Sequence, residues 1–470
     1  MALEFGMTKR GKRTLIYNGF EFWKKHVNQD DETLWRCCKR ERFHCKATVK
    51  TAFDRIIGKS DPLHTHSGNA ANALARQAVG KMKEIMTQNI ATPSASQGAV
   101  VVNLDGHVQM ALPKRASLSR VLRRHRQIES MIANNGAALP PLPTDKDFII
   151  PPRFQQNLLH DSGTGESRIL VFGDVQLVTA LGRATLWLAD GTFKVVPGLF
   201  YQLYSIHFDS TGGVHPTALY CLLPNKTHAT YVRLLNVVKE LVPNASPTRI
   251  LVDFESAAMN AFRDAFPGTD VTGCYFHLCQ SIVRKVNEIG LKATYEADHE
   301  IRGFIRCLAA LSHVPPADVM TAFEVLVDEM PRNEQVGDVV TYFELTYLRG
   351  RRRPGRGENY APAIFPIPTW NQHGAAGDGV ARTTNSVEGW HHSLQALFMC
   401  QHPTMWTFLA GMERDTQLTK AAYLQAATGE VHLGKKTYRD LRARVQRAVA
   451  TYGSVDILTY LYAIAHLSHA

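Results

Sequence analysis

Short apolar segments separated by Gly, Pro and Asp recur from residue 168 onward. Five of them are rich in β-branched or aromatic residues, which favours strands. They cover residues 168–172, 184–189, 200–208, 214–222 and 249–252. Amphipathic segments at 230–242 and 256–265 predict helices on either side of the last strand. Because strands are followed by strand–helix alternation, the pattern predicts a mixed sheet with helices packed on it.

The regions after this sheet have mostly helical patterns. Residues 276–350 and 385–465 are expected to be mainly helical. The Arg-, Gly- and Pro-rich stretch 351–380 between them predicts a loop.

The chain before the sheet is more varied. Residues 117–132 predict a basic helix, with Ser117 or Ser119 as its cap. Its apolar stripe would comprise Leu118, Val121, Leu122, Ile128 and Ile132. The Ala-, Asn- and Gln-rich stretch 67–112 predicts a linker with some helix, and the Pro-rich stretch 139–152 marks a boundary.

Length and composition limit the class of protein. At ~100–200 residues per domain, 470 residues predict roughly two to four units. Apolar runs fall short of the ~18 residues that a membrane span needs, so no membrane partner is expected. Lys and Arg at residues 9–13 replace the apolar stretch of a signal peptide, which argues against secretion.

The net charge of +11 points to a polyanionic partner, and nucleic acid is the usual one. Basic clusters occur within residues 1–66, 114–126 and 349–356. Any one cluster could be ordinary solvated surface, but three together favour a phosphate-binding surface. The residues expected to contact DNA are Arg123, Arg124, Arg351, Arg352 and Arg353.

Cys37, Cys45, His64 and His66 form a candidate metal site. Zinc binds two thiolates and two imidazoles in a tetrahedron, and a segment of ~60 residues buries little core without such a centre. A β-turn between two strands would separate the cysteines, and one side of a strand would carry both imidazoles. The spacing differs from common Cys₂His₂ fingers, so a basic β-domain with incidental Cys and His remains the alternative.

Three acids lie where metal chemistry is plausible. Asp190 and Asp253 each follow a short apolar run, so each is expected at the end of a buried strand. Glu388 lies near the start of a predicted helix, with Asn385 as its candidate cap. Two Mg²⁺ ions about 3.5–4 Å apart can stabilise both reacting oxygens of a phosphodiester, and Mg²⁺ prefers carboxylates. Each acid alone is more often a turn or cap residue.

The N-terminal segment 13–66 resembles FLYWCH-type zinc fingers. That family has an aromatic/Gly hairpin, Trp-x-Cys, a second Cys and His-x-His. The matching residues are Tyr17, Gly19, Phe20, Phe22, Trp35, Cys37, Cys45, His64 and His66. Cys38 is an alternative first ligand, but Cys37 shares a strand face with Trp35 and is favoured. The resemblance implies a structural zinc and a DNA-binding or protein-binding module.

The region from about 140 to 420 resembles Mutator-like element (MULE) transposases. Its motifs are Ala-Asp-Gly-Thr-Phe-Lys around Asp190, Val-Asp-Phe-Glu-Ser around Asp253, Gly-Cys-Tyr-Phe-His at 273–277, and the segment around Glu388. The resemblance implies an RNase H-like core with a helical insertion. It also makes the three acids the catalytic Mg²⁺ or Mn²⁺ ligands of a DDE transposase, which cleaves DNA and transfers strands.

Several residues beside these motifs are candidate neighbours of the catalytic site. Lys194 could contact a phosphate, and Trp390 could stack on an unpaired base or instead pack in the core. Cys274 and His277 would lie near the acids or pack under the sheet. Thr384 stands where the family usually has Asn, but that position is not a metal ligand.

These patterns predict an α/β or α+β protein in five parts. They are a FLYWCH-type finger at 1–66, a linker with a basic helix at 67–150, the first part of an RNase H-like core at 151–280, a helical insertion at 281–380, and the end of the core with C-terminal helices at 381–470. The leading prediction is a nuclear, homo-oligomeric transposase that acts on transposon ends and target DNA. The alternative is a domesticated, catalytically silent DNA-binding regulator. Such regulators commonly lose catalytic carboxylates, and this chain retains all three.

Overall fold

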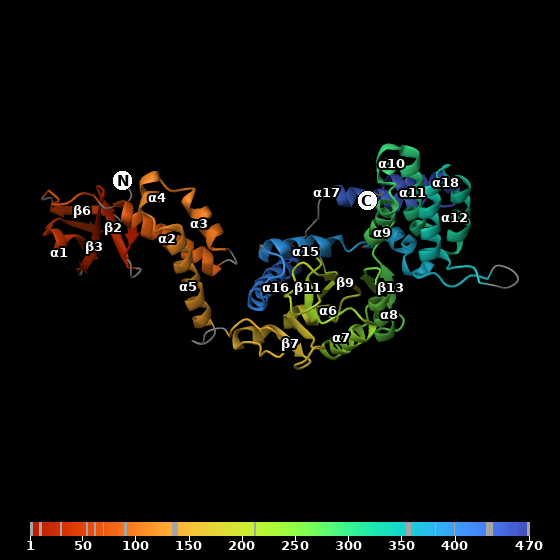
Figure 1. Ribbon diagram of the computed structural model, residues 1–470, viewed down its shortest axis with the longest axis horizontal. Helices are drawn as coiled ribbons and strands as arrows, with labels where there is room; N and C mark the ends of the chain where they lie inside the picture. The colour runs from red at the N-terminus through yellow and green to blue at the C-terminus, as the bar shows by residue number, and fades with distance from the viewer. Residues whose placement is uncertain are drawn as a thin grey trace. The chain divides into compact units, whose positions relative to one another are not determined.

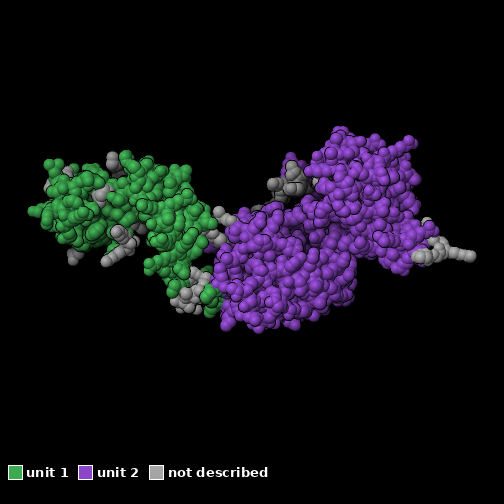
Figure 2. All heavy atoms as spheres, viewed as in Figure 1, with its two compact units in different colours: residues 1–141, 151–153 green, residues 142–150, 154–470 purple. Residues whose placement is uncertain are grey.

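The chain forms two compact units, each with its own buried core. A computed structural model describes residues 3–8, 12–28, 31–52, 55–60, 63–68, 70–88, 92–133, 140–210, 213–353, 359–380, 382–398, 400–428 and 436–467. The N-terminal unit comprises Met1–Pro141 with Pro151–Arg153, and the C-terminal unit comprises Leu142–Ile150 with Phe154–Ala470 (Figure 2).

The N-terminal unit begins with a six-stranded antiparallel sheet. Its strands neighbour one another in chain order: β1 (Glu4–Met7), β2 (Arg13–Tyr17), β3 (Phe20–Val27), β4 (Thr33–Cys37), β5 (Thr48–Ala52) and β6 (Arg55–Ser60). Asn18 and Gly19 connect β2 to β3 with φ of 47° and 79°, the left-handed conformation that an Asn-Gly hairpin turn requires. A single helical turn, α1 (Arg40–Phe43), lies between β4 and β5.

Helices follow the sheet in the described part of this unit (Figure 1). They are α2 (Ala70–Gln88), α3 (Pro93–Val101), α4 (Gly106–Ala111) and α5 (Arg115–Ala133). Helices α2, α3 and α5 share a buried cluster that contains Ala78, Met82, Met86, Val100, Leu118 and Leu122. The helix expected within the linker over 67–112 is therefore present, and much of it packs into the core of this unit. An Ala/Met stripe spaced by four residues buries a helix face, although its contrast with neighbouring Ala and Gln is weak in the sequence.

The basic helix exists as α5, but two details of its prediction are wrong. It begins at Arg115, so Ser117 and Ser119 lie inside it and neither is its cap. Only two members of the expected stripe are buried, because the face that packs on α2 and α3 runs through Leu118 and Leu122. The other three are exposed: Val121, Ile128 and Ile132.

The C-terminal unit contains a seven-stranded mixed sheet in the order β13-β12-β9-β10-β11-β8-β7. Its strands are β7 (Leu158–Asp161), β8 (Leu170–Gly173), β9 (Leu186–Thr192), β10 (Gln202–Phe208), β11 (Thr217–Leu223), β12 (Arg249–Val252) and β13 (Asp270–Gly273). β12 runs parallel to β9 and β13, whereas the other pairs are antiparallel. The predicted mixed sheet is confirmed; the sequence prediction did not include β7 and β13.

Helices cover both faces of this sheet (Figure 1). On one face lie α6 (Val175–Leu181), α7 (His228–Leu241) and α8 (Ser256–Ala265); on the other lie α15 (Asn385–Phe398) and α16 (Met405–Ala427). Side chains alternate along β9, so Trp187 faces α7 and α8 while Leu188 packs against Val387 of α15. Asp190 continues the row of Leu188 and therefore faces α15.

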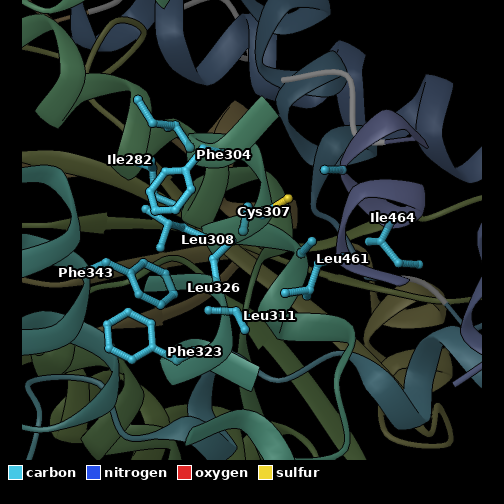
Figure 3. Close-up of a cluster of buried hydrophobic side chains, with 14 of the residues drawn as sticks. Ile282, Phe304, Cys307, Leu308, Leu311, Phe323, Leu326, Phe343, Leu461 and Ile464 are labelled. Carbon is cyan, nitrogen blue, oxygen red and sulfur yellow. The ribbon is translucent and has the colours of Figure 1, made fainter. Parts of the chain in front are cut away.

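A helical region extends from the sheet and has a separate core. It contains α9 (Tyr275–Glu288), α10 (Lys292–Ala297), α11 (His299–Ala310), α12 (Val319–Asp328), α13 (Glu334–Phe343), α14 (His373–Gly377), α17 (Lys436–Val449) and α18 (Ile457–Leu467). Figure 3 shows Phe304 and Leu308 of α11 in this core together with Leu461 and Ile464 of α18. Within the described residues, the helices lack the length and apolar character needed to cross a membrane.

Candidate functional site

The four predicted zinc donors of the N-terminal unit lie together. The Cys37 Sγ is 3.1 Å from Nε2 of His66, and the Cys45 Sγ is 3.2 Å from Nδ1 of His64. The two imidazole nitrogens are 3.4 Å apart, and all four donor atoms lie within 4.8 Å of one another. Zinc bonds of about 2.3 Å to sulfur and about 2.0 Å to nitrogen give a tetrahedron with edges of roughly 3.3–3.8 Å. The donor set therefore fits zinc.

The local structure around the cysteines differs in part from the prediction. Cys37 ends β4 on the same buried face as Trp35, as expected. Cys38 is partly exposed and lies outside the donor cluster. Helical turn α1, rather than a β-turn, separates Cys37 from Cys45. The amide of Phe43 donates a hydrogen bond to the Lys39 carbonyl, which is the pattern of a helical turn.

The two histidines lie in an irregular segment and not on a strand, so that prediction is wrong. Contacts with other elements bring the imidazoles of His64 and His66 together instead. Phe20 of β3 stacks on the His64 ring with centroids 3.5 Å apart. The Thr65 hydroxyl donates to the Phe43 carbonyl at 2.6 Å. His66 Nδ1 is 2.8 Å from the Ser67 carbonyl, which fixes the tautomer that turns the Nε2 lone pair toward the cysteines.

The two thiols share a nearly water-free space. Cys37 and Cys45 are both buried. Burial, together with the adjacent Cys45, raises the pKa of Cys37 to about 12. Only the thiolate binds a metal, so a nearby cation is what would favour the ligating form of this side chain.

The three predicted catalytic acids come from three elements of the C-terminal unit. Asp253 directly follows β12, as predicted. Asp190 lies within β9 and not after its end, because the strand continues to Thr192 through pairing with β10. Glu388 is in the first turn of α15, which begins at Asn385, so Asn385 is a helical residue and not the cap.

His277 of α9 connects two of these acids. Its Nε2 is 3.0 Å from Oε1 of Glu388, and its Nδ1 is 3.3 Å from Oδ1 of Asp253. The third acid, Asp190, is 3.8 Å through its Oδ2 from Nδ1 of His391. The structure therefore brings the three acids together around two imidazoles. Sequence reasoning gave His391 little weight, although its spacing of three residues from Glu388 puts both on one face of α15.

Charges in this site perturb one another strongly. Burial raises the pKa of Asp190 to about 7; the positive charge of His277 opposes this rise, and the negative charges of Asp253 and Glu388 add to it. Burial lowers the pKa of His277, but its hydrogen bonds with Cys274 and Glu388 outweigh burial and raise it to about 11. Burial and the charge of His392 lower the pKa of His391 to about 4.

Backbone groups fix the carboxylates in place. The amide of Gly191 donates to Oδ1 of Asp190 at 2.7 Å, and the amide of Phe254 donates to Oδ1 of Asp253 at 2.6 Å. Cys274, fully buried at the start of α9, accepts a hydrogen bond from the Thr384 amide at 3.1 Å. This bond ties α9 to the segment that leads into α15, so Cys274 helps to bring His277 and Glu388 together.

Family models match two parts of the chain. A model of the FLYWCH zinc finger domain matches residues 5–66, which include all four zinc donors. A model of the MULE transposase domain matches residues 186–281, which include Asp190, Asp253 and His277. The chain carries a FLYWCH zinc finger domain and a MULE transposase domain. No curated protein matches it. The two domains support a transposase-like DNA-binding protein.

A buried carboxylate outside the MULE match supports α15. Asp415 of α16 accepts hydrogen bonds from the Tyr220 hydroxyl at 2.6 Å and from Nε1 of Trp390 at 2.8 Å. The Trp390 ring packs beside His207, with centroids 4.8 Å apart. These contacts correspond to the core-packing alternative for Trp390. No sequence signal singled out Asp415, because its partners are remote in the chain.

The remaining predicted site residues are on the surface. Lys194 is exposed just after β9. Arg123 and Arg124 are exposed on α5. Arg351, Arg352 and Arg353 are exposed in the segment after α13. Lys9, Arg10 and Arg356, from the predicted basic runs, lie outside the described residues.

The acids of the MULE domain differ from the FLYWCH donors as a metal site. Among the described residues, only the FLYWCH set has its donor atoms all within 4.8 Å of one another. A pair of Mg²⁺ ions about 3.5–4 Å apart needs ligands spread more widely than one ion does. Three convergent carboxylates are the chemistry that Mg²⁺ or Mn²⁺ prefers. Burial raises the pKa of Asp190 to about 7 and the negative charges of Asp253 and Glu388 add to the rise, so a bound cation would favour the ionised carboxylate.

Proposed function

We propose that this chain is a DDE-type DNA transposase in which the FLYWCH finger holds DNA. The observation that carries the proposal is the convergence of Asp190, Asp253 and Glu388 around His277 and His391. Glu388 lies far along the chain from the other two acids, and the fold still brings it to them. A structural role alone does not require three acids to gather at one face of a sheet.

The strand arrangement supports an RNase H-like catalytic core. The first three strands of the MULE domain, β9, β10 and β11, form an antiparallel meander. The next two, β12 and β13, add in parallel beside β9. An RNase H-like core has this order, with its first strand in the centre and the catalytic acids at the first and fourth strands. Helices α9 to α14 of the helical region lie between the fourth-strand acid and the glutamate in the chain, as an insertion would, whereas α17 and α18 follow the glutamate.

Asp190, Asp253 and Glu388 would hold Mg²⁺ or Mn²⁺. Bound ions would stabilise the attacking and leaving oxygens of the phosphodiester. The protein's own residues orient this set. Backbone amides hold one oxygen each of Asp190 and Asp253, and His277 holds Glu388 through Nε2. We also propose that the chain acts in the nucleus and pairs two DNA ends as a homo-oligomer, because transposition joins ends of one element to a target.

The test is cleavage of a DNA duplex that carries candidate terminal repeats, by the purified full chain with Mg²⁺ or Mn²⁺. We expect metal-dependent nicks that vanish in Asp190→Ala and Glu388→Ala. The matched control is Asp264→Ala, which removes an exposed acid of α8. Specific binding without cleavage at either metal would overturn the catalytic proposal and favour the silent DNA-binding regulator.

A further inference from the structure

The two faces of the FLYWCH sheet differ in character. Trp35 and Cys37 of β4 are buried on the face that carries the zinc donors. Side chains alternate along a strand, so Arg36 between them lies on the opposite face. The strand register places Trp23 of β3 and Thr48 of β5 beside Arg36. This opposite face, the outer face, takes no part in the zinc cluster.

Helix α2 covers the first part of the outer face. Ala73 packs so closely on β1 that a Cβ added to Gly6 would come within 3.0 Å of its methyl group. Arg76 forms an ion pair with the buried carboxylate of Glu21 on β3. Thr14, the cross-strand partner of Trp23, is fully buried.

Beyond Thr14 the outer face is open, aromatic and basic. Trp23 is 42% exposed. Arg36 follows on β4, and its guanidinium is only weakly engaged, 3.8 Å from the exposed carboxylate of Glu41. Lys50 of β5 is exposed, and it lies on the same face because it is two residues from Thr48, the cross-strand partner of Arg36. Gly58 is the cross-strand partner of Lys50 and adds no side chain to the surface.

We propose that this open part of the outer face binds an unpaired segment of DNA. Trp23 would stack on a base, and Arg36 and Lys50 would contact backbone phosphates. A ring that lies on a broad sheet can stack only on a base that has left the duplex, and aromatic rings beside cations are the usual platform for single strands. The cations match the charge of the backbone. The inference rests on the proposed function only in taking DNA as the partner.

The test measures binding of the full chain, by fluorescence anisotropy, to three labelled probes. They are a short single strand, the same strand in a fully paired duplex, and that duplex with an unpaired central bubble. We expect Trp23→Ala to bind the single strand and the bubble roughly 5- to 100-fold more weakly. Trp23→Phe, which keeps a ring, should retain most of the affinity. The fully paired duplex should bind Trp23→Ala nearly as well as the unaltered chain.

Arg36 and Lys50 should affect the salt dependence of binding. The double variant Arg36→Gln/Lys50→Gln should reduce the dependence of log K on log salt by about 1.4 on the single strand, at about 0.7 per phosphate contact. Trp23→Ala should leave that slope unchanged. The matched control is Lys24→Gln, which removes a charge from the neighbouring residue on the opposite side of β3. Zinc content of every variant checks that the finger is folded.

Two results would overturn the inference. The first is unaltered binding of the single strand by Trp23→Ala in a protein that retains its zinc. The second is an equal loss for Trp23→Ala on all three probes, since stacking on an unpaired base cannot affect a fully paired duplex. Neither result bears on cleavage by Asp190, Asp253 and Glu388. Absence of cleavage by a chain that shows the expected probe preferences would overturn the catalytic proposal alone.

Discussion

The FLYWCH finger and the MULE domain hold their polar sites by different means. In the finger, two of the buried core side chains, Cys37 and Cys45, are themselves metal donors. In the MULE domain, Asp190 and Asp253 come from a sheet that has apolar clusters on both faces, and Asp190 lies beyond Leu188 in one apolar row. The metal should therefore be part of the finger's fold, whereas the MULE fold should exist without its ions.

The largest expected effect is loss of the finger on zinc removal. Cys45→Ser, or a chelator, should unfold β1–β6, because structural zinc contributes on the order of 10 kcal/mol to such domains. Helix α2 should lose amide protection with it, since Arg76 pairs with Glu21 of β3. Hydrogen exchange with zinc analysis measures this, and the C-terminal unit is the internal control. A finger that stays protected in zinc-free protein would abolish the contrast between the two sites.

The reciprocal prediction concerns the acids. Asp190→Ala should lower the rate of cleavage by about 10³-fold or more, because metal ions supply several kcal/mol of transition-state stabilisation. It should not lower the free energy of unfolding of the metal-free protein at pH 8, since burial already disfavours the ionised carboxylate there. Denaturant unfolding and a cleavage assay test both halves. A marked loss of stability would mean that the MULE site, like the finger, is part of its own core.

The third prediction concerns Asp415, a buried acid with a structural role. Asp415→Ala removes the acceptor of Tyr220 and of Trp390, and should lower the free energy of unfolding by about 2 kcal/mol, because a buried donor and a partly buried donor lose their partner. Urea unfolding measures the loss. Gln417→Ala, an exposed position on α16, is the matched control and should change stability little. Equal stability of the two variants would contradict the role given to Asp415.

The smallest expected effect is a pH dependence at the sheet edge. Burial tends to raise the pKa of Asp161, but the hydrogen bonds with Arg168 outweigh it and lower the pKa below its usual value. A group with a lowered folded-state pKa contributes stability above its unfolded pKa of about 3.9. That stability is lost as pH falls through the folded pKa. Because Asp161 is exposed and solvent screens its charge, we expect Asp161→Asn to remove only about 0.5 kcal/mol at neutral pH.

Urea unfolding of the two proteins at pH 7 and at pH 3 measures this contribution. The difference between them should be largest at pH 7 and should shrink as the pH is lowered. A difference that is the same at both pH values would show that the aspartate contributes packing and not charge. In the finger, by comparison, the stability should depend on pH through metal binding, because its donors bind metal only when deprotonated.

The sequence predicted elements well where their apolar pattern was strong. β12 and α8 have the bounds that the sequence predicted, since 250–252 is an unbroken apolar run and 256–265 has a clear helical stripe. β7 and β13 have only four residues each, too few for a periodic signal. For 70–111 the sequence predicted only some helix within a linker, because the buried stripe of Ala78, Met82 and Met86 contrasts little with the neighbouring Ala and Gln.

Site residues could be predicted where the neighbouring sequence carries a recognisable pattern. The zinc donors carry a spacing pattern, and their grouping is present in the structure. The approach of Glu388 to the other acids depends on tertiary packing that no local pattern encodes. Asp415 is a stronger case, since 195 positions separate it from Tyr220 and nothing in the neighbouring sequence relates the two.

Helix α9 belongs to both parts of the C-terminal unit. Its first turn carries His277 to the acids, while Ile282 and Val286 are anchored in the core of the helical region. A tilt of α9 about the anchored end of the helix would therefore move His277. From His277 to Glu288 it is about 16 Å long at 1.5 Å per residue, so a tilt of about 4° shifts the imidazole by about 1 Å. Since a displacement of 1 Å can change a rate by about 100-fold, a shift of the helical core would reach Asp253 and Glu388 through the contacts of His277.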